Sequence, residues 1–287
     1  MQIGVIFPQT EMGGHPRNVR EYAVGVERLG YRHLVAFDHV VGADPAVHHG
    51  WAAPYDVDTT FHEPLVLFGY LAAITSLELV SGVLILPQRQ TVLVAKQAAE
   101  VDLLSGGRLR LGIGLGWNAV EYEALGRDFT NRGVRSEEQV NLLRRLWTEP
   151  SVSHRGPSEQ VTGAGIAPSP VQRPIPIWFG AASPRAYRRI GRLGDGWFPA
   201  HQPGPDLDQA RAIIDGAAID AGRDTDEIGM EGRVNWGPAG LDGALTDLDA
   251  WRHAGASHVS INTMNAGFTD VEQHLDALTS IAARTDT

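Results

Sequence analysis

Asp38 and His39 are the residues whose types and spacing best suit proton transfer. They directly follow residues 33–37, an apolar run that predicts a β-strand. An imidazole near its neutral point can donate or accept a proton at physiological pH, and an adjacent carboxylate can tune or orient it. The pair is therefore a candidate catalytic site. A hydrogen-bonded pair that caps a loop is the structural alternative.

A glycine-rich segment, GIGLGWN at 112–118, is a candidate cofactor contact. It lacks the third glycine at the spacing of a dinucleotide fingerprint, so it is a weak signal for a Rossmann fold. Glycines at the end of a strand would let a flat ring approach the backbone, with Trp117 and Asn118 at its edge. The residues concerned are Gly114, Gly116, Trp117 and Asn118. A tight turn from strand to helix explains the same glycines equally well.

A third candidate is the segment Gly180, Ala181, Ala182 and Ser183, which precedes a predicted helix at residue 184. Free backbone N–H groups at a positive helix end, together with the Ser183 hydroxyl, would form a cradle for a phosphate or carboxylate. Plain N-capping of the helix by Ser183 is the alternative. A phosphorylated cofactor would fit at this place.

Composition narrows the classes of function. The chain has 287 residues, 43% of them hydrophobic, a formal charge of −10 and no cysteine. The acidic balance disfavours nucleic-acid binding, and the absence of cysteine excludes disulfides, thiolate metal sites and a cysteine nucleophile. No stretch approaches the ~20 apolar residues that cross a bilayer, and the N-terminus lacks the pattern of a signal peptide, so we expect a soluble cytoplasmic protein without a membrane partner. His48 and His49 have no partner at zinc-helix spacing, so we expect no metal site.

Strand-like and helix-like runs alternate along the whole chain, which is typical of a parallel sheet built from βα units. Eight pairs, in a length near the roughly 250 residues typical of such barrels, predict a single (β/α)8 TIM-barrel domain over residues 1–287. An open doubly wound sheet is the rival fold. Residues 148–174, rich in Pro, Gly and Ser, are expected to form an excursion between the halves, with room for a short hairpin. The predicted strands are 2–7, 33–37, 78–85, 108–114, 175–180, 196–200, 228–234 and 258–262, and the predicted helices are 17–29, 64–75, 91–104, 119–125, 136–147, 184–193, 206–221, 240–253 and 271–283.

The barrel would bring the candidate residues together. Active sites of such barrels lie at the carboxyl ends of the strands, where the βα loops converge. Asp38-His39, the glycines after the fourth strand and the segment 180–183 all stand at predicted strand ends. We expect the first two of the tryptophans Trp178, Trp197 and Trp236 to pack in the core or wall of the barrel.

The combined pattern resembles the luciferase-like monooxygenase superfamily, and within it the bacterial oxidoreductases that use the deazaflavin coenzyme F420. The resemblance rests on AFDHV at 36–40, on the long segment at 81–126, on NRGVRSEEQVNLLRRLW at 131–147 and on PIWFGAASPRAYRRIGRLGDGWFPA at 176–200. It implies a barrel of the bacterial luciferase-like type with an insertion between the halves. It also implies a cofactor whose ring lies near strands two to four and whose phosphate lies near Gly180 to Ser183.

The same resemblance implies a non-prolyl cis peptide in the third strand, which maps onto Gly82 and Val83. Because a deazaflavin carries hydride, the implied reaction is hydride transfer between coenzyme F420 and an unidentified small organic substrate, with His39 assisting proton transfer. FMN as cofactor of a monooxygenase that uses reduced flavin and oxygen is the alternative, and a non-catalytic flavin-binding protein is a third. Relatives are commonly homodimers, so we expect a homodimer.

Two positions depart from the sugar-phosphate dehydrogenases of this family. Where those enzymes have a glutamate shortly after the strand-four glycines and a tryptophan beyond the histidine, this chain has Trp117 and Ala43. We therefore do not expect a sugar-phosphate substrate.

Overall fold

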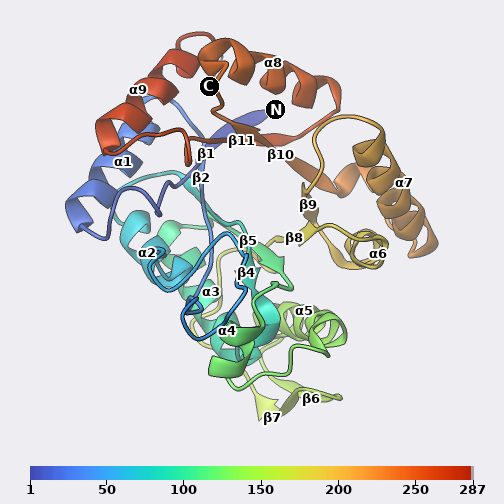
Figure 1. Cartoon of the computed structure of the whole chain (residues 1–287). Coiled ribbons are helices and arrows are strands. Elements are labelled where there is room, and N and C mark those ends of the chain that lie inside the picture. Colours follow the sequence, from blue (N-terminus) through green and yellow to red (C-terminus); the bar gives the residue numbers. More distant parts are fainter. Residues whose placement is uncertain (286–287) are drawn as a thin grey trace.

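Eight parallel strand positions close into a barrel in the computed structural model, which describes residues 1–285 (Figure 1). The hydrogen-bonded order is β3-β2-β1-β11-β10-β9-β8-β5-β4, and a direct β3–β5 pairing closes the ring. β3 and β4 are two pieces of one strand position. The strands are β1 (Gln2–Ile6), β2 (His33–Ala36), β3 (Glu78–Ser81), β4 (Leu84–Ile85), β5 (Leu109–Gly114), β8 (Ile177–Ala181), β9 (Gly196–Pro199), β10 (Gly229–Asn235) and β11 (His258–Asn262).

Helices surround this barrel and cover its outer surface (Figure 1). The closure confirms the predicted (β/α)8 fold and excludes the open sheet, because β3 and β5 would not pair with each other in an open sheet. Trp178 and Trp197 are buried, at 5% and 2% exposure, as expected for core and wall residues. The helices are α1 (Pro16–Arg28), α2 (Pro64–Ala72), η1 (Leu86–Gln88), α3 (Thr91–Ser105), α4 (Ala119–Ala124), α5 (Arg132–Thr148), α6 (Pro184–Leu193), α7 (Pro205–Asp220), η2 (Thr225–Glu227), α8 (Gly240–His253) and α9 (Val271–Ala282).

Most predicted elements differ from the structure by one to three residues at an end, and two of them differ more. The third strand was expected to run unbroken over 78–85, but it stops at Ser81 and resumes at Leu84, and the intervening Gly82–Val83 peptide is cis. α5 begins at Arg132, four residues before the predicted start at 136. Its first turn was missed because it is held by a buried cation: Arg135 donates to the Arg89 carbonyl (3.1 Å) and to Glu159 (2.8 Å).

The excursion between the two halves does contain a hairpin. β6 (Val152–Arg155) and β7 (Gln160–Ala164) pair antiparallel outside the barrel. Glu138 of α5 holds the hairpin: its carboxylate lies 2.9 Å from His154 Nε2 and accepts the Ser158 N–H at 3.0 Å. In the part of the chain that the structure describes, no helix has the length and apolar character required to cross a membrane.

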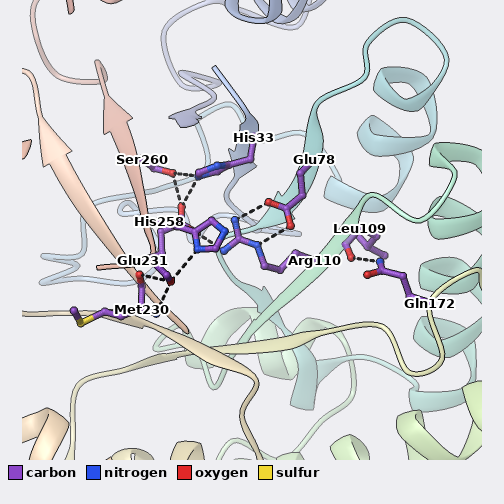
Figure 2. Close-up of polar contacts among 10 residues, drawn as sticks. His33, Glu78, Leu109, Arg110, Gln172, Met230, Glu231, His258 and Ser260 are labelled. Carbon is purple, nitrogen blue, oxygen red and sulfur yellow. Dashed lines mark hydrogen bonds and ion pairs between the residues drawn. The ribbon is translucent and has the colours of Figure 1, made fainter. Parts of the chain in front are cut away.

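Charged side chains fill the amino-terminal half of the barrel (Figure 2). Arg110, 2% exposed, donates twice to Glu78 (3.1 and 3.0 Å) and once to Glu231, and its guanidinium lies 4.3 Å above the Trp178 ring. His33 Nε2 is 3.0 Å from Glu231. Burial alone would raise the pKa of the Glu231 carboxyl, but Arg110 and His33 outweigh it and hold that pKa far below its usual range. Glu231 is therefore a buried anion whose neutralisation depends on Arg110.

His258 at the start of β11 makes the stability of this network depend on pH. Burial first, and then the neighbouring Arg110 and His33, lower the pKa of His258 from 6.5 to about 4, although Glu231 and Glu78 also face it and oppose the shift. Because the unfolded chain binds a proton at His258 more readily than the folded chain, the contribution of neutral His258 to stability is present above pH 6.5. This contribution is lost as the pH falls toward 4. Between pH 7 and pH 5, His258 should lower the free energy of unfolding by roughly 1 to 2 kcal/mol.

We expect His258→Gln to remove this part of the pH dependence. The measurement is the free energy of unfolding in urea at pH 7 and pH 5 for the wild type, for His258→Gln and for His253→Gln, which changes an exposed histidine on α8. The wild type and His253→Gln should lose stability in parallel between the two pH values, and His258→Gln should lose less. Equal losses in all three proteins would contradict this assignment.

Candidate active site

His39 lies just beyond β2, and a buried carboxylate from α4 holds it. Its Nδ1 is 3.6 Å from Glu121 Oε2, with only 12% and 2% of the two side chains exposed. Glu121 also accepts the backbone N–H groups of Val40 and Val41. Burial raises the pKa of Glu121, but the neighbouring His39 and the N–H of Val40 outweigh it, and the pKa lies below its usual value. An ionised Glu121 favours the tautomer with a proton on Nδ1, which leaves Nε2 of His39 for a ligand.

Asn118 fixes Glu121 in this position. Asn118 is the N-cap of α4, and its side-chain oxygen accepts the N–H groups of Val120 (3.1 Å) and Glu121 (3.3 Å). Its amide nitrogen donates to the Val41 carbonyl at 3.4 Å. Asn118 was predicted to lie at the edge of a cofactor ring. In the structure Asn118 is the N-cap of α4, and its side chain links the loop after β5 to the loop after β2.

An aromatic cluster surrounds the His39 ring. The ring centroids of Phe61, Tyr55 and Trp117 lie 4.7, 5.1 and 5.4 Å from that of His39. Trp117 is 42% exposed, so this cluster opens to solvent on that side. Next to it lies a cavity of about 350 Å³ without a lysine or arginine in its wall; it is lined by His39, Val40, Val41, Gly42, Tyr55, Asp56, Val57, Thr59, Phe61 and Asn118.

The long connection from β2 to α2 is drawn together at its base. The Val57 N–H donates to the Ala43 carbonyl at 3.0 Å. The backbone at Gly42 is so close to that of Asp56 that a Cβ on residue 42 would lie 2.1 Å from the Asp56 carbonyl oxygen. Residues between these two contacts form a compact loop whose ends touch, of the Ω type. Its base supplies one wall of the cavity.

Asp38 points away from His39, which corrects the expectation that it orients the imidazole. One of its carboxylate oxygens accepts from Arg89 at 2.7 Å and the other from the Ile85 N–H at 2.9 Å. Arg89 also pairs with Glu63 at 2.8 Å. Burial raises the pKa of Asp38 by more than Arg89 and the Ile85 N–H lower it. Asp38 thus ties the end of β2 to β4, while the carboxylate beside His39 belongs to Glu121.

The predicted cis peptide is present between Gly82 and Val83, and Val83 explains two of the glycines. A Cβ on Gly114 would lie 2.4 Å from Val83 Cγ2, and one on Gly180 would lie 3.0 Å from Val83 Cγ1. The side chain of Val83 therefore takes the space above both glycines. Gly114 was expected to admit a flat ring directly, and Gly180 was expected to belong to the phosphate cradle. Gly116 has φ +66° and serves a tight turn, the structural alternative for this segment.

A family model described as luciferase-like monooxygenase matches residues 1–234. The chain belongs to this family. An F420-dependent glucose-6-phosphate dehydrogenase of Kribbella flavida is 30% identical over 200 residues, which are 67% of this chain and 55% of that protein. An uncharacterised protein of Mycobacterium tuberculosis is 35% identical over 164 residues, 57% of this chain and 56% of that one. The chain thus spans about half the length of the curated relatives it matches.

Solved structures share the same luciferase-like barrel. An F420-dependent secondary alcohol dehydrogenase in complex with an F420-acetone adduct superposes with a TM-score of 0.79 at 17% identity and 99% coverage of both chains. The monooxygenase RslO1 from Streptomyces bottropensis superposes with a TM-score of 0.76 at 19% identity, with 99% of this chain and 98% of that chain covered. At these identities the likeness concerns the fold.

The segment 180–183 lies at the start of α6 in this luciferase-like barrel. Ser183 is the N-cap, and its hydroxyl accepts the Ala186 N–H at 3.4 Å. Ala182 and Ser183 are exposed, and Gly180 and Ala181 are half-buried. The N-capping alternative is therefore present, and binding of a phosphate at the same helix end stays a prediction. Among residues 1–285, no group of three or more His, Asp or Glu side chains is arranged to hold a metal ion.

Proposed function

We propose that this protein is an F420-dependent oxidoreductase that transfers hydride between the deazaflavin and a small organic substrate, with His39 assisting proton transfer. The observation that carries the proposal is His39, which is held by Glu121 and lines a cavity together with Tyr55 and Phe61. The F420-dependent relatives support the choice of cofactor.

The chain offers groups that fit such a cofactor. The exposed N-terminus of α6, with Ser183, can hold a phosphate through backbone N–H groups, since this helix end carries no acidic residue in its first turn. Val83, on the break between β3 and β4, is the side chain that would support one face of the ring. When bound, F420 supplies the hydride-carrying ring, whereas the protein supplies position and protons.

His39 can act on a substrate through Nε2, giving or taking the proton that accompanies hydride transfer. Glu121 keeps Nδ1 engaged and stabilises the imidazole when it is charged. The surrounding Tyr55 and Phe61 shield the ring from water, and the side next to Trp117 stays open to solvent. Because no cation lines the cavity, we propose a neutral substrate and not a sugar phosphate, in keeping with Trp117 and Ala43 at the two divergent positions.

A titration of the purified apoprotein with F420 and with FMN, followed by fluorescence, tests the cofactor. Tight F420 binding is expected. Tight FMN binding without F420 binding would replace the proposal by a flavin-dependent monooxygenase, the class of the fold neighbour RslO1. F420 binding without turnover across a panel of small alcohols and ketones would favour a non-catalytic cofactor-binding protein.

Glu121→Gln should lower turnover by about tenfold to a hundredfold while His39 stays in place. The amide retains the length of the side chain, but it no longer places a negative charge beside Nδ1 of His39, so kcat should fall while thermal stability stays nearly unchanged. Glu123→Gln, an exposed change of the same type on α4, is the matched control. A loss of thermal stability in parallel with the loss of kcat would mean that Glu121 only supports the loop.

We also propose that the protein is a homodimer. Helices α2 and α3 pack together and expose large apolar side chains, among them Val66 (71%), Leu93 (51%) and Leu104 (58%). Such a patch on the surface of a globular protein is a usual place for association. Sedimentation equilibrium of the wild type and of Leu93→Glu tests the proposal, and a wild-type monomer at micromolar concentration would contradict it.

A further inference from the structure

A row of arginines follows one face of α6, directly beyond the proposed phosphate site. Arg185, Arg188, Arg189 and Arg192 are spaced at i, i+3, i+4 and i+7, which brings their side chains to one side of the helix. They line a cavity of about 510 Å³ between α5 and α6, which begins at Leu115 after β5 and passes Ser183; Arg132 of α5 also lines it. In a chain with a net charge of −10, five arginines around one cavity are a strong local excess of positive charge.

Only part of this charge is neutralised within the protein. Glu137 of α5 pairs with Arg189 (3.1 Å) and with Arg192 (2.8 Å). Arg185 and Arg188 are exposed, and neither has a carboxylate partner within residues 1–285. Cations in the first turn of a helix oppose its dipole, and like charges at i, i+3 destabilise it. The sequence thus keeps two arginines where helix stability alone would favour acidic or neutral residues.

We propose that this arginine groove, defined by Arg132, Arg185, Arg188, Arg189 and Arg192, binds the glutamyl carboxylates of the F420 side chain; this rests on the proposed use of F420. A phosphate held at Ser183 would place whatever extends beyond it at the mouth of the groove. In F420 that extension is a lactyl chain bearing γ-linked glutamates, and FMN ends at its phosphate. Guanidinium groups bind carboxylates through paired hydrogen bonds, so Arg185 and Arg188 are the groups that would bind the glutamyl carboxylates.

The groove would therefore distinguish the two cofactors by charge beyond the phosphate. It also predicts a preference among natural forms of F420, since each added glutamate brings another carboxylate. Exposed ion pairs contribute little singly, so the preference should come from several contacts and should weaken as salt screens them.

The test compares two probes by fluorescence titration: F420 without glutamates and F420 with several glutamates. At low ionic strength, the wild type should bind the long form about tenfold more tightly than the short form. Arg185→Gln combined with Arg188→Gln should abolish most of that difference and leave the affinity for the short form unchanged. Arg20→Gln with Arg28→Gln, which removes the same charge from exposed positions of α1, should keep the preference.

Each other outcome decides against the groove. Equal binding of the two forms by the wild type would overturn it while leaving F420 use intact. If the Arg185→Gln/Arg188→Gln variant no longer binds either form of F420 and its thermal unfolding is unchanged, the two arginines bind the phosphate and not the glutamyl chain. Binding of FMN but of neither form of F420 would overturn the proposed function as well.

Discussion

Replacing His39 by alanine is expected to lower turnover by about 10²- to 10⁴-fold, the range usual for loss of a general acid or base. The imidazole is held by Glu121, lines the cavity and is the proposed proton-transfer group. Cofactor affinity should stay nearly unchanged, because the proposed ring contact is Val83, between β3 and β4, and the proposed phosphate site is the N-terminus of α6. The measurement is the rate of F420 reduction or oxidation, followed by absorbance, with the best substrate of the alcohol and ketone panel.

His49→Ala is the matched control for this variant, since it removes an exposed histidine from the same β2–α2 connection. Its turnover should equal that of the wild type. If His39→Ala binds F420 and turns over the substrate at the wild-type rate, the catalytic role of His39 is wrong. A loss of both activity and F420 binding would instead make His39 a cofactor contact.

Arg110→Met is expected to destabilise the protein by about 3 to 5 kcal/mol, because it leaves Glu231 as an uncompensated charge inside the barrel. Glu231 is 3% exposed and its low pKa depends on Arg110 and His33. Methionine can still pack against the Trp178 ring, but it provides neither the cation nor the hydrogen bonds. The free energy of unfolding in urea at pH 7 gives the loss directly.

The double variant Arg110→Met with Glu231→Met separates charge from packing. Removing both partners should restore a large part of the lost stability, since no buried anion remains. Arg145→Met, which breaks an exposed i,i+4 pair with Glu149, should change stability little. If the double variant is less stable than Arg110→Met alone, the network stabilises the barrel by packing and not by charge compensation.

Much of the fold could be predicted because the barrel depends on local patterns. Each strand is a short apolar run and each helix follows at a regular interval, so α6 and α8 were predicted with the bounds that the structure has. The interruption between β3 and β4 was not visible as a break in apolar character, since Val83 continues the run. Only the cis peptide at this place was expected, and that expectation came from the family resemblance. The first turn of α5 was missed since its buried residue, Arg135, is polar.

The candidate site was predicted less completely, because its decisive contact joins distant segments. His39 could be predicted from its place after a strand, but Glu121 was missed. Asn118 and Glu121 have the spacing of a helix capping box, so a local role explains them both. In the structure Glu121 reaches across to His39 and Val40 instead. Tyr55 and Phe61 were missed as well, because the course of a long loop does not follow from periodicity.

The closed base of the β2–α2 loop bears on how this barrel could acquire new substrates. Because Ala43 and Val57 are joined by a hydrogen bond and Gly42 lies against Asp56, the loop enters and leaves the barrel at one point. The segment between them can be exchanged, lengthened or shortened without moving the backbone that carries His39. Loop grafts from relatives, cut at Ala43 and Val57, are thus a practical route to altered selectivity with the His39–Glu121 pair retained.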